Sequence, residues 1–258
     1  MMARRGMTAR RTDRTALFGA TSGIATAVAR QLAGQGGARL LLVGRDADAL
    51  GAMAADLRVR GAAEVVVLQA DLARPEALRS VAQPAWDAFG GLDLALLAYG
   101  TLPDQPAAEA DLGLAEAALT VNFVSPSLLL GLLAPHFEAA RAGTIAVITS
   151  VAGDRGRRSN TLYGAAKGGL QRYLEGLRHR LHGAGVQVLD VRPGFVATRM
   201  TAHLPRSGLL WSEPGRVAKD ILGAVRAGRA VLYTPWFWRG IMLVVRGLPR
   251  PVFHRTRL

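Results

Sequence analysis

A tyrosine and a lysine four residues apart are the side chains of this sequence best suited to acid–base chemistry. Tyr163 and Lys167 belong to a stretch of helical composition, and a spacing of four puts both on one face of a helix. A neighbouring ammonium group favours the phenolate and so lowers the pKa of the phenol towards the working range. Such a phenol can give a proton to a carbonyl oxygen while hydride reaches the carbon. The pair could serve a carbonyl reductase, but by itself this spacing is common by chance and usually marks a solvated helix face.

A glycine-rich turn follows the first apolar run of the chain. This turn, Gly19-Ala20-Thr21-Ser22-Gly23-Ile24-Ala25, joins a strand-like segment, Thr15–Phe18, to a helical one, Ile24–Gln35. Small residues at that point let the backbone approach a pyrophosphate at the helix N-terminus. We therefore expect a dinucleotide site. The spacing differs from GxGxxG, so a simple turn is the alternative.

Polar residues after the second strand-like segment indicate which dinucleotide is bound. Arg45 and Asp46 follow Arg39–Val43 after one glycine, Gly44. In dinucleotide folds an arginine at this place accommodates a 2′-phosphate, whereas an acidic residue takes the ribose hydroxyls. Arg45 therefore favours NADP(H), and Asp46 leaves NAD(H) open. A solvated residue at a helix start is the alternative interpretation of Arg45.

Further motifs in the same order make the chain resemble the short-chain dehydrogenase/reductase family. The glycine turn is similar to the family's TGxxxGxG loop, with Ala25 in place of the last glycine. Ser150 ends a strand-like segment ahead of Tyr163, Asn122 lies in Val-Asn-Phe, and Pro193–Thr198 matches PGxVxT. One departure is Ala98-Tyr99-Gly100, where the family has Asn-Ala-Gly; the missing Asn puts the usual tie between neighbouring strands in doubt. The resemblance runs from about Thr15 to Tyr233.

The resemblance implies roles for these residues. Tyr163 is expected to donate the proton, with Lys167 lowering its pKa, while Ser150 holds the substrate carbonyl and Asn122 takes part in a proton relay. The implied cofactor residues are Gly19, Thr21, Ser22, Gly23, Ile24, Arg45, Asp71, Leu72, Gly100, Pro193, Gly194, Val196 and Thr198. For Asp71, expected beside the adenine, a helix N-cap ahead of Pro75 is the structural alternative.

More narrowly, the C-terminal half resembles the family members that reduce a keto pentose carried by decaprenyl phosphate. That reaction converts a 2-keto-erythropentose, made by a flavin-dependent oxidase partner, into arabinose for cell-wall arabinan. Four arginines near the catalytic strand ends fit such a polyprenyl phosphate because guanidinium groups bind phosphodiesters well; they are Arg155, Arg157, Arg158 and Arg199. Surface charge is the alternative for each. A reductase of another lipophilic ketone needs no such cluster, and a non-catalytic nucleotide-binding protein is the least favoured class.

The C-terminal stretch Trp236–Gly247 combines apolar residues with Arg239 and Arg246, which fall seven apart on one side of a helix. This pattern is typical of an interfacial helix, and docking on the chain's own domain or on a symmetry mate is the alternative. We expect a cytoplasmic protein, peripheral on the inner face of the cell membrane. The uncharged stretch Ala117–Pro135 predicts a long buried helix and a homo-oligomer.

The net charge of +13 is concentrated at the two ends of the chain. Residues 1–14 hold five arginines against one aspartate, and residues 236–258 hold five arginines and no acid. Nucleic-acid binding is therefore not expected, because it needs a basic patch on a folded surface. The absence of cysteine and the five scattered histidines argue against a disulfide framework or a metal site.

The elements that must position these residues alternate between strand-like and helix-like composition. Nearly continuous apolar strands separated by helices predict a parallel sheet covered on both faces. We expect one doubly wound α/β domain of the Rossmann type over residues 15–235, after a disordered basic tail over 1–14 and before a basic amphipathic extension over 236–258. The other expected strands are Glu64–Gln69, Leu92–Ala98, Thr144–Thr149, Val186–Val191 and Ala230–Tyr233. The other expected helices are Ala47–Val59, Glu76–Phe89, Leu112–Ala140, Tyr163–His182 and Glu213–Ala227.

Overall fold

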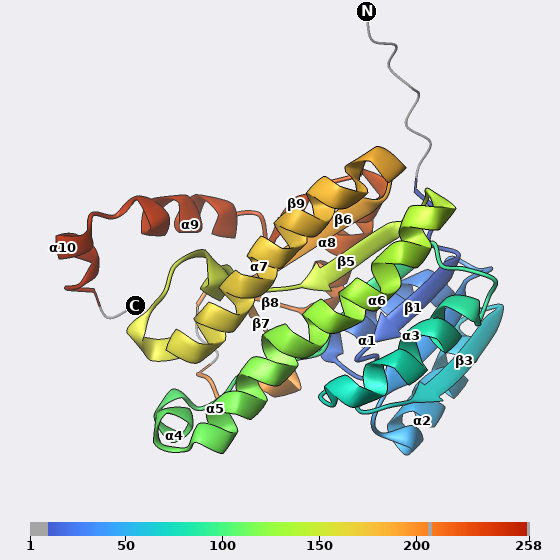
Figure 1. Cartoon of the computed structure of the whole chain (residues 1–258), viewed down its shortest axis with the longest axis horizontal. Helices are drawn as coiled ribbons and strands as arrows, with labels where there is room; N and C mark the ends of the chain where they lie inside the picture. Colours follow the sequence, from blue (N-terminus) through green and yellow to red (C-terminus); the bar gives the residue numbers. More distant parts are fainter. Residues whose placement is uncertain (1–9, 206–207, 257–258) are drawn as a thin grey trace, which may run out of the picture.

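Seven parallel strands form the central sheet of the computed structural model, which describes residues 10–205 and 208–256 (Figure 1). The strand order is β3-β2-β1-β4-β5-β6-β9. The strands are β1 (Arg14–Phe18), β2 (Arg39–Gly44), β3 (Glu64–Gln69), β4 (Leu94–Leu97), β5 (Thr144–Ile148), β6 (Gln187–Pro193) and β9 (Val231–Thr234). The order reverses between β1 and β4, and ligands of such sheets bind at the carboxyl ends of the strands near this reversal. The predicted doubly wound α/β fold is confirmed.

Helices cover both faces of the sheet because the strands are apolar on both sides. One face packs against α1 (Gly23–Ala33), α2 (Ala47–Val59) and α8 (Pro214–Arg226) in one hydrophobic cluster. The other packs against α3 (Leu78–Asp87), α6 (Ser125–Ala140) and α7 (Thr161–Leu181) in a second cluster. Figure 1 shows α6 and α7 side by side in front of the sheet.

The predicted helix Leu112–Ala140 consists of α5 (Leu112–Leu119), a π-helical turn η2 (Thr120–Val124) and α6. By length and composition this continuous helix could cross a membrane, and 44% of its most apolar window is buried inside the protein. Leu129, Leu133 and Phe137 of α6 are fully buried in the core. The expected buried helix is therefore present, with one face packed and the other exposed.

Several short elements differ from the expected ones. A helix, α4 (Gln105–Ala110), precedes α5, and two-residue strands β7 (Phe195–Val196) and β8 (Trp211–Ser212) form a separate small sheet. Short 3-10 turns, among them η3 (Val151–Asp154), connect the longer elements. These pieces are too short to show a hydrophobic period in the sequence.

Residues 10–14 of the predicted disordered tail have defined contacts, so the tail boundary at residue 14 is wrong. Arg10 donates to the carbonyl oxygens of Gly143 and Gly185, both at 3.1 Å. Arg14 begins β1 and forms an ion pair with Asp93 at 2.9 Å. The rest of the predicted tail, residues 1–9, lies outside the described residues.

The C-terminal extension forms α9 (Trp238–Gly247) and α10 (Arg250–Phe253). Trp238, Met242 and Val245 are buried against Val151, which directly follows Ser150. One face of the predicted amphipathic helix is therefore docked on the protein's own domain, as the docking alternative required. The opposite face leaves Leu243 and Val244 exposed.

Candidate active site

The four residues with expected catalytic roles come together at the carboxyl ends of β4 and β5. Ser150 follows β5, Tyr163 and Lys167 lie in the first turns of α7, and Asn122 lies in η2. Gly100, after β4, lies against two of these side chains. A Cβ added there would lie 2.7 Å from Asn122 Oδ1 and 3.3 Å from Lys167 Nζ. A side chain at Gly100 would thus collide with the site.

Asn122 is completely buried, and its amide is held by hydrogen bonds to the backbone. Its Nδ2 donates to the carbonyl oxygens of Thr101 at 3.0 Å and Ala118 at 2.9 Å, and its Oδ1 accepts from the N–H of Thr101 at 3.2 Å. The π-helical turn interrupts the regular hydrogen-bond pattern of the helix at this residue. Such turns inside α-helices occur frequently at functional sites.

Burial dominates the acid–base properties of the tyrosine–lysine pair. The Nζ of Lys167 lies 5.8 Å from the centre of the Tyr163 ring and donates to the carbonyl oxygen of Ile148 at 3.3 Å. Burial lowers the pKa of Lys167 to about 8, against the opposing effect of Asp190. Burial also raises the pKa of Tyr163 to about 12, against a hydrogen bond with Ser150. Burial therefore outweighs the expected lowering of the phenol's pKa by the lysine, and the phenol keeps the proton that a donor needs.

Ser150 is held in place by its own turn and by α7. Its Oγ accepts from the N–H of Ala152 at 3.1 Å, and its carbonyl oxygen accepts from Nε2 of Gln171 at 2.8 Å. Gly153 lies against α7, since a Cβ added there would be 2.7 Å from the backbone nitrogen of Gly168. The serine oxygen accepts from Ala152, and its O–H can still donate a hydrogen bond.

The glycine loop and the segment after β6 fit a dinucleotide. Gly19 has φ +80°, and a Cβ there would lie 2.7 Å from the Cβ of Tyr99. Ser22 caps α1 by accepting from the N–H of Ala25 at 3.2 Å. A Cβ on Gly23 would lie 3.1 Å from Cγ2 of Thr198. The loop therefore passes close to the segment after β6, and the helix N-terminus lies between them, where a phosphate is favoured.

Other predicted cofactor residues differ in what their side chains do. Ile24, Leu72 and Val196 are buried, so only their backbone or the edge of the side chain can reach a ligand. The carboxylate of Asp71, expected beside the adenine, accepts from the N–H of Ala73 at 3.0 Å and lies 3.6 Å from Nε of Arg74. These contacts form a local turn and not the helix N-cap of the structural alternative. The Asp71 carboxylate stays partly exposed.

Arg45 and Asp46, at the end of β2, have different local contacts. Asp46 caps α2 by accepting from the N–H of Ala49 at 2.9 Å. Arg45 is exposed, and its carbonyl oxygen accepts from Nε2 of Gln69. The carboxylate is thus engaged in a helix cap, while the guanidinium group faces solvent beside the expected ribose position.

Tyr99, the residue after Ala98 at the family's usual Asn position, supplies a different tie between the strands. Its hydroxyl lies 3.1 Å from Oγ of Ser125 on α6, and that hydroxyl in turn donates to the carbonyl oxygen of Leu72 after β3. Burial raises the pKa of Tyr99, so the phenol stays protonated. The ends of β3 and β4 are therefore tied through two hydroxyl groups instead of an asparagine.

Two of the four arginines expected to bind substrate instead contact backbone carbonyl oxygens of the protein, which corrects their predicted role. Arg155 donates to the carbonyl oxygens of Val245 and, at 2.8 Å, Leu248 at the end of α9, and it lies 3.7 Å from the centre of the Phe253 ring. Arg199 donates to the carbonyl oxygen of Thr21 at 2.8 Å. Arg155 therefore holds the C-terminal extension, and Arg199 holds the glycine loop.

The other two arginines stay near the catalytic residues with fewer contacts. Among the described side chains, Arg157 has a buried Nε without a hydrogen-bond partner, and burial lowers its pKa against the effect of Asp154. Arg158 is exposed at the start of a short turn before α7. Both remain candidates for contact with an anionic ligand.

Comparison with known proteins identifies the family. The family model described as short chain dehydrogenase matches residues 14–207. The chain belongs to the short-chain dehydrogenase/reductase family. It is 38% identical to an uncharacterized oxidoreductase of Mycobacterium tuberculosis over 93% of this chain and 95% of the relative. It is 36% identical to an uncharacterized oxidoreductase of Streptomyces coelicolor over 93% and 94%.

A solved structure agrees with this assignment. A short-chain dehydrogenase from Sphingobium yanoikuyae in complex with NADPH superposes with a TM-score of 0.80 at 26% identity, covering 95% of this chain and 96% of that one. Together with the family assignment, this similarity shows that the protein described here is an NAD(P)-dependent oxidoreductase. Its nicotinamide cofactor supplies or accepts the hydride, and the glycine loop with the segment after β6 would hold it.

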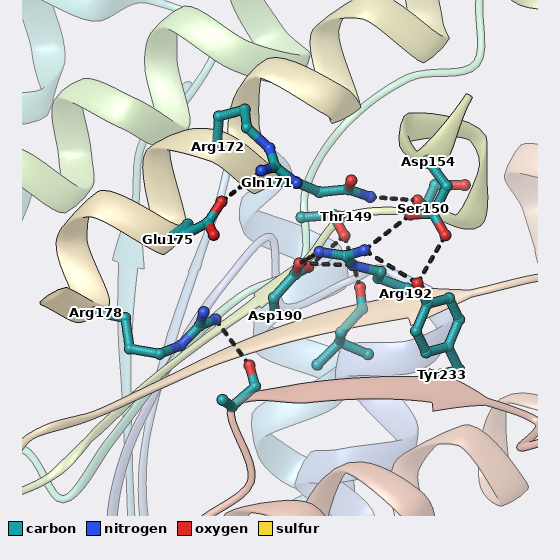
Figure 2. A network of polar contacts seen from close by, with 12 residues as sticks. Thr149, Ser150, Asp154, Gln171, Arg172, Glu175, Arg178, Asp190, Arg192 and Tyr233 are labelled. Carbon is teal, nitrogen blue, oxygen red and sulfur yellow. Dashed lines mark hydrogen bonds and ion pairs between the residues drawn. The ribbon is translucent and has the colours of Figure 1, made fainter. Parts of the chain in front are cut away.

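The site of this short-chain dehydrogenase also contains a buried ionic network that the sequence did not reveal (Figure 2). Arg192 of β6 forms ion pairs with Asp190 at 2.6 Å and with Asp154 at 2.9 Å. Tyr233 of β9 donates to Asp154 at 2.7 Å. Asp154 is 38 residues from Arg192 and 79 residues from Tyr233, so no local motif could indicate these two contacts.

Trp238 is a second residue of the site that the sequence pattern assigned to another role. It was expected on an interfacial helix, yet it is buried, and a Cβ added to Gly194 would lie 1.9 Å from its Nε1. The indole therefore lies directly on the backbone of the Pro193–Gly194 turn. The structure has a helix where the sequence predicted an amphipathic one, but the hydrophobic period could not show which side faces the domain.

Proposed function

We propose that this protein uses NADPH to reduce the ketone of a lipophilic, anionic substrate, namely a 2-keto-erythropentose carried by a polyprenyl phosphate. The product is the arabinose epimer, in the second step of a ribose-to-arabinose epimerisation. The proposal that the substrate is lipophilic rests on a set of exposed apolar side chains around the segment after β6. These are Phe195, Met200, Leu209 and Leu210.

The proposed catalytic roles follow from the geometry of the four central residues. Tyr163 donates its proton to the carbonyl oxygen, and Ser150 donates a hydrogen bond to the same oxygen, which stabilises the developing charge. Lys167 stabilises the phenolate left on Tyr163. Asn122 fixes the backbone at Thr101, beside Gly100, and takes part in returning a proton to the site.

The anionic part of the proposal rests on Arg157 and Arg158. Their loop connects the Ser150 turn to the helix that carries Tyr163, so both guanidinium groups belong to the substrate end of the site. An unpaired, partly buried guanidinium group is suited to a phosphodiester, because charge-assisted hydrogen bonds offset its desolvation. A lipophilic ketone without a phosphate is the second candidate, favoured by the engagement of Arg155 and Arg199 in protein contacts.

The proposal implies a supplier and a location for the substrate. The 2-keto group must come from oxidation of a ribose precursor, and a flavin-dependent oxidase is the proposed partner. A polyprenyl phosphate resides in a membrane, and the outer face of α9, with exposed Leu243, Val244 and Arg246, supports peripheral contact with the inner face of the cell membrane. The protein is proposed to act from the cytoplasm.

A coupled assay tests this proposal. A flavin-dependent oxidase generates the keto pentose on decaprenyl phosphate, and the purified protein is added with NADPH. We expect NADPH oxidation and formation of the arabinose product. Tyr163→Phe should lower kcat about a hundredfold to ten-thousandfold while NADPH binding, measured by fluorescence, is retained. Arg158→Ala should raise KM by about tenfold or more with little effect on kcat.

Two results would contradict different parts of the proposal. If the keto pentose is not consumed while 2-decanone is reduced, the anionic substrate is wrong and the lipophilic ketone remains. If Tyr163→Phe reduces substrate at nearly the wild-type rate, the catalytic assignment is wrong. Arg226→Ala, at the far end of α8, serves as a control for the removal of one positive charge.

A further inference from the structure

We propose that Arg192 is a positioning residue that fixes the Ser150 turn relative to the Pro193–Gly194 turn through its ion pairs with Asp154 and Asp190. The inference rests on the role proposed for Ser150. It does not depend on the identity of the ketone.

The guanidinium group lies between the two turns that hold the reactants. Arg192 is followed directly by Pro193, and Asp154 ends the η3 turn that Ser150 begins. Nη1 of Arg192 donates to Asp154 at 2.9 Å, and its Nε donates to Asp190 at 2.7 Å. One planar group therefore connects β6, which leads into the Pro193–Gly194 turn, to the turn that begins at Ser150.

Burial makes this connection rigid. The side chains of Asp154 and Asp190 are 0% and 1% exposed, and that of Arg192 is 11% exposed. Water therefore competes little for their hydrogen bonds, and the fork of a guanidinium group allows only one arrangement with both carboxylates. Tyr233 of β9 donates to Asp154 at 2.7 Å and lies 3.1 Å from Nη1 of Arg192, which adds the sheet edge to the same unit (Figure 2).

The network also reaches the catalytic lysine. Thr149, the residue before Ser150, donates to Asp190 at 2.5 Å, and Asp190 acts to raise the pKa of Lys167. Arg192 pairs directly with both buried carboxylates. A buried charge without a partner is strongly destabilising, so these pairs restrict how far either turn can move.

A conservative substitution tests positioning apart from folding. Arg192→Ala would remove the ion-pair partner of two buried carboxylates, and this variant is expected to fold poorly. Arg192→Lys keeps the charge, but a single ammonium group cannot reproduce the fork. We expect Arg192→Lys to lower kcat by about tenfold to a hundredfold, as small misplacements of reacting groups do, with the Kd for NADPH and the KM for the ketone within a few-fold of wild type.

A matched control is available in Arg178, which lies in the same view. Its Nε donates to the carbonyl oxygen of Val188 at 3.0 Å and its Nη2 to that of Ala230 at 2.8 Å. It therefore joins the start of β6 to the residue before β9, at the opposite ends of these strands from Arg192. Arg178→Lys is expected to lower Tm and to leave kcat unchanged.

The decisive measurements are kcat, KM, NADPH affinity and Tm for these variants and for Asp154→Asn. If Arg192 and Asp154 act as one unit, Arg192→Lys/Asp154→Asn should lose no more kcat than the more impaired single variant. A wild-type kcat for Arg192→Lys, or a loss matched by Arg178→Lys, would overturn the inference. These outcomes are separable from failure of the catalytic assignment, because that failure would appear as an active Tyr163→Phe variant.

Discussion

Arg45 is the residue on which the preference between the two nicotinamide cofactors depends. Its neighbour Asp46 is engaged in capping α2, which leaves the arginine as the exposed group at the end of β2. A guanidinium group stabilises a 2′-phosphate and gains nothing from a free hydroxyl. We expect NADPH to have a higher kcat/KM than NADH, and Arg45→Ala to lower kcat/KM about tenfold or more for NADPH only. Equal losses with both cofactors, or an initial preference for NADH, would contradict this expectation.

At the scale of residues, the sequence predicted which side chains come together in the site but not the pKa of the catalytic phenol. The spacing of Tyr163 and Lys167 and the order of the motifs placed four polar side chains together. The pKa of Tyr163, in contrast, depends on how much water the finished site excludes, and burial raises it to about 12. The extent of burial is a property of the packed domain, so a spacing of four residues could not reveal it.

At the scale of elements, the hydrophobic period predicted long segments and missed short ones. The bounds of α2 and β3 are those expected, because each has a continuous pattern with clear ends. The π-helical turn at Asn122 and the pairing of β7 with β8 depend on contacts distant in sequence. The same limit applies to α9, whose amphipathic pattern is compatible with docking on protein or on lipid.

Mutations on the two faces of α9 should have different effects. Met242→Ala removes a side chain that is 1% exposed and should cost about 2–5 kcal/mol of stability, with loss of activity because Val151 beside Ser150 loses its cover. Leu243→Glu/Val244→Glu changes residues 72% and 65% exposed and should leave Tm and the reduction of 2-decanone unchanged. The double variant should, however, bind less to vesicles that contain phosphatidylglycerol, as measured by flotation.

Deletion of residues 236–258 gives a complementary result. It should remove both membrane binding and activity, because the docked face covers the catalytic turn. Vesicle binding that is unchanged in Leu243→Glu/Val244→Glu would contradict the membrane proposal and leave α9 as a purely structural part of the domain.

At the scale of the whole molecule, the outer face of the helices in front of the sheet is the surface best suited to a second copy of the chain. α6 and α7 lie side by side there (Figure 1), and the exposed positions from the end of η2 through α6 include Val124, Leu128, Gly131 and Pro135. These residues recur every three or four positions and are all uncharged, so they form one stripe. An apolar stripe on each of two copies can pack face to face in a two-fold interface.

A charge placed in this stripe should therefore dissociate the oligomer. We expect the wild-type protein to be at least a dimer by size-exclusion chromatography with light scattering. Leu128→Glu, at a residue 48% exposed, should shift it to the monomer, because a buried carboxylate in the interface lacks a partner. Val59→Glu, at a residue 89% exposed at the end of α2, is the matched control and should leave the mass unchanged. A monomeric wild-type protein, or an unchanged mass for Leu128→Glu, would show that this stripe does not join two copies.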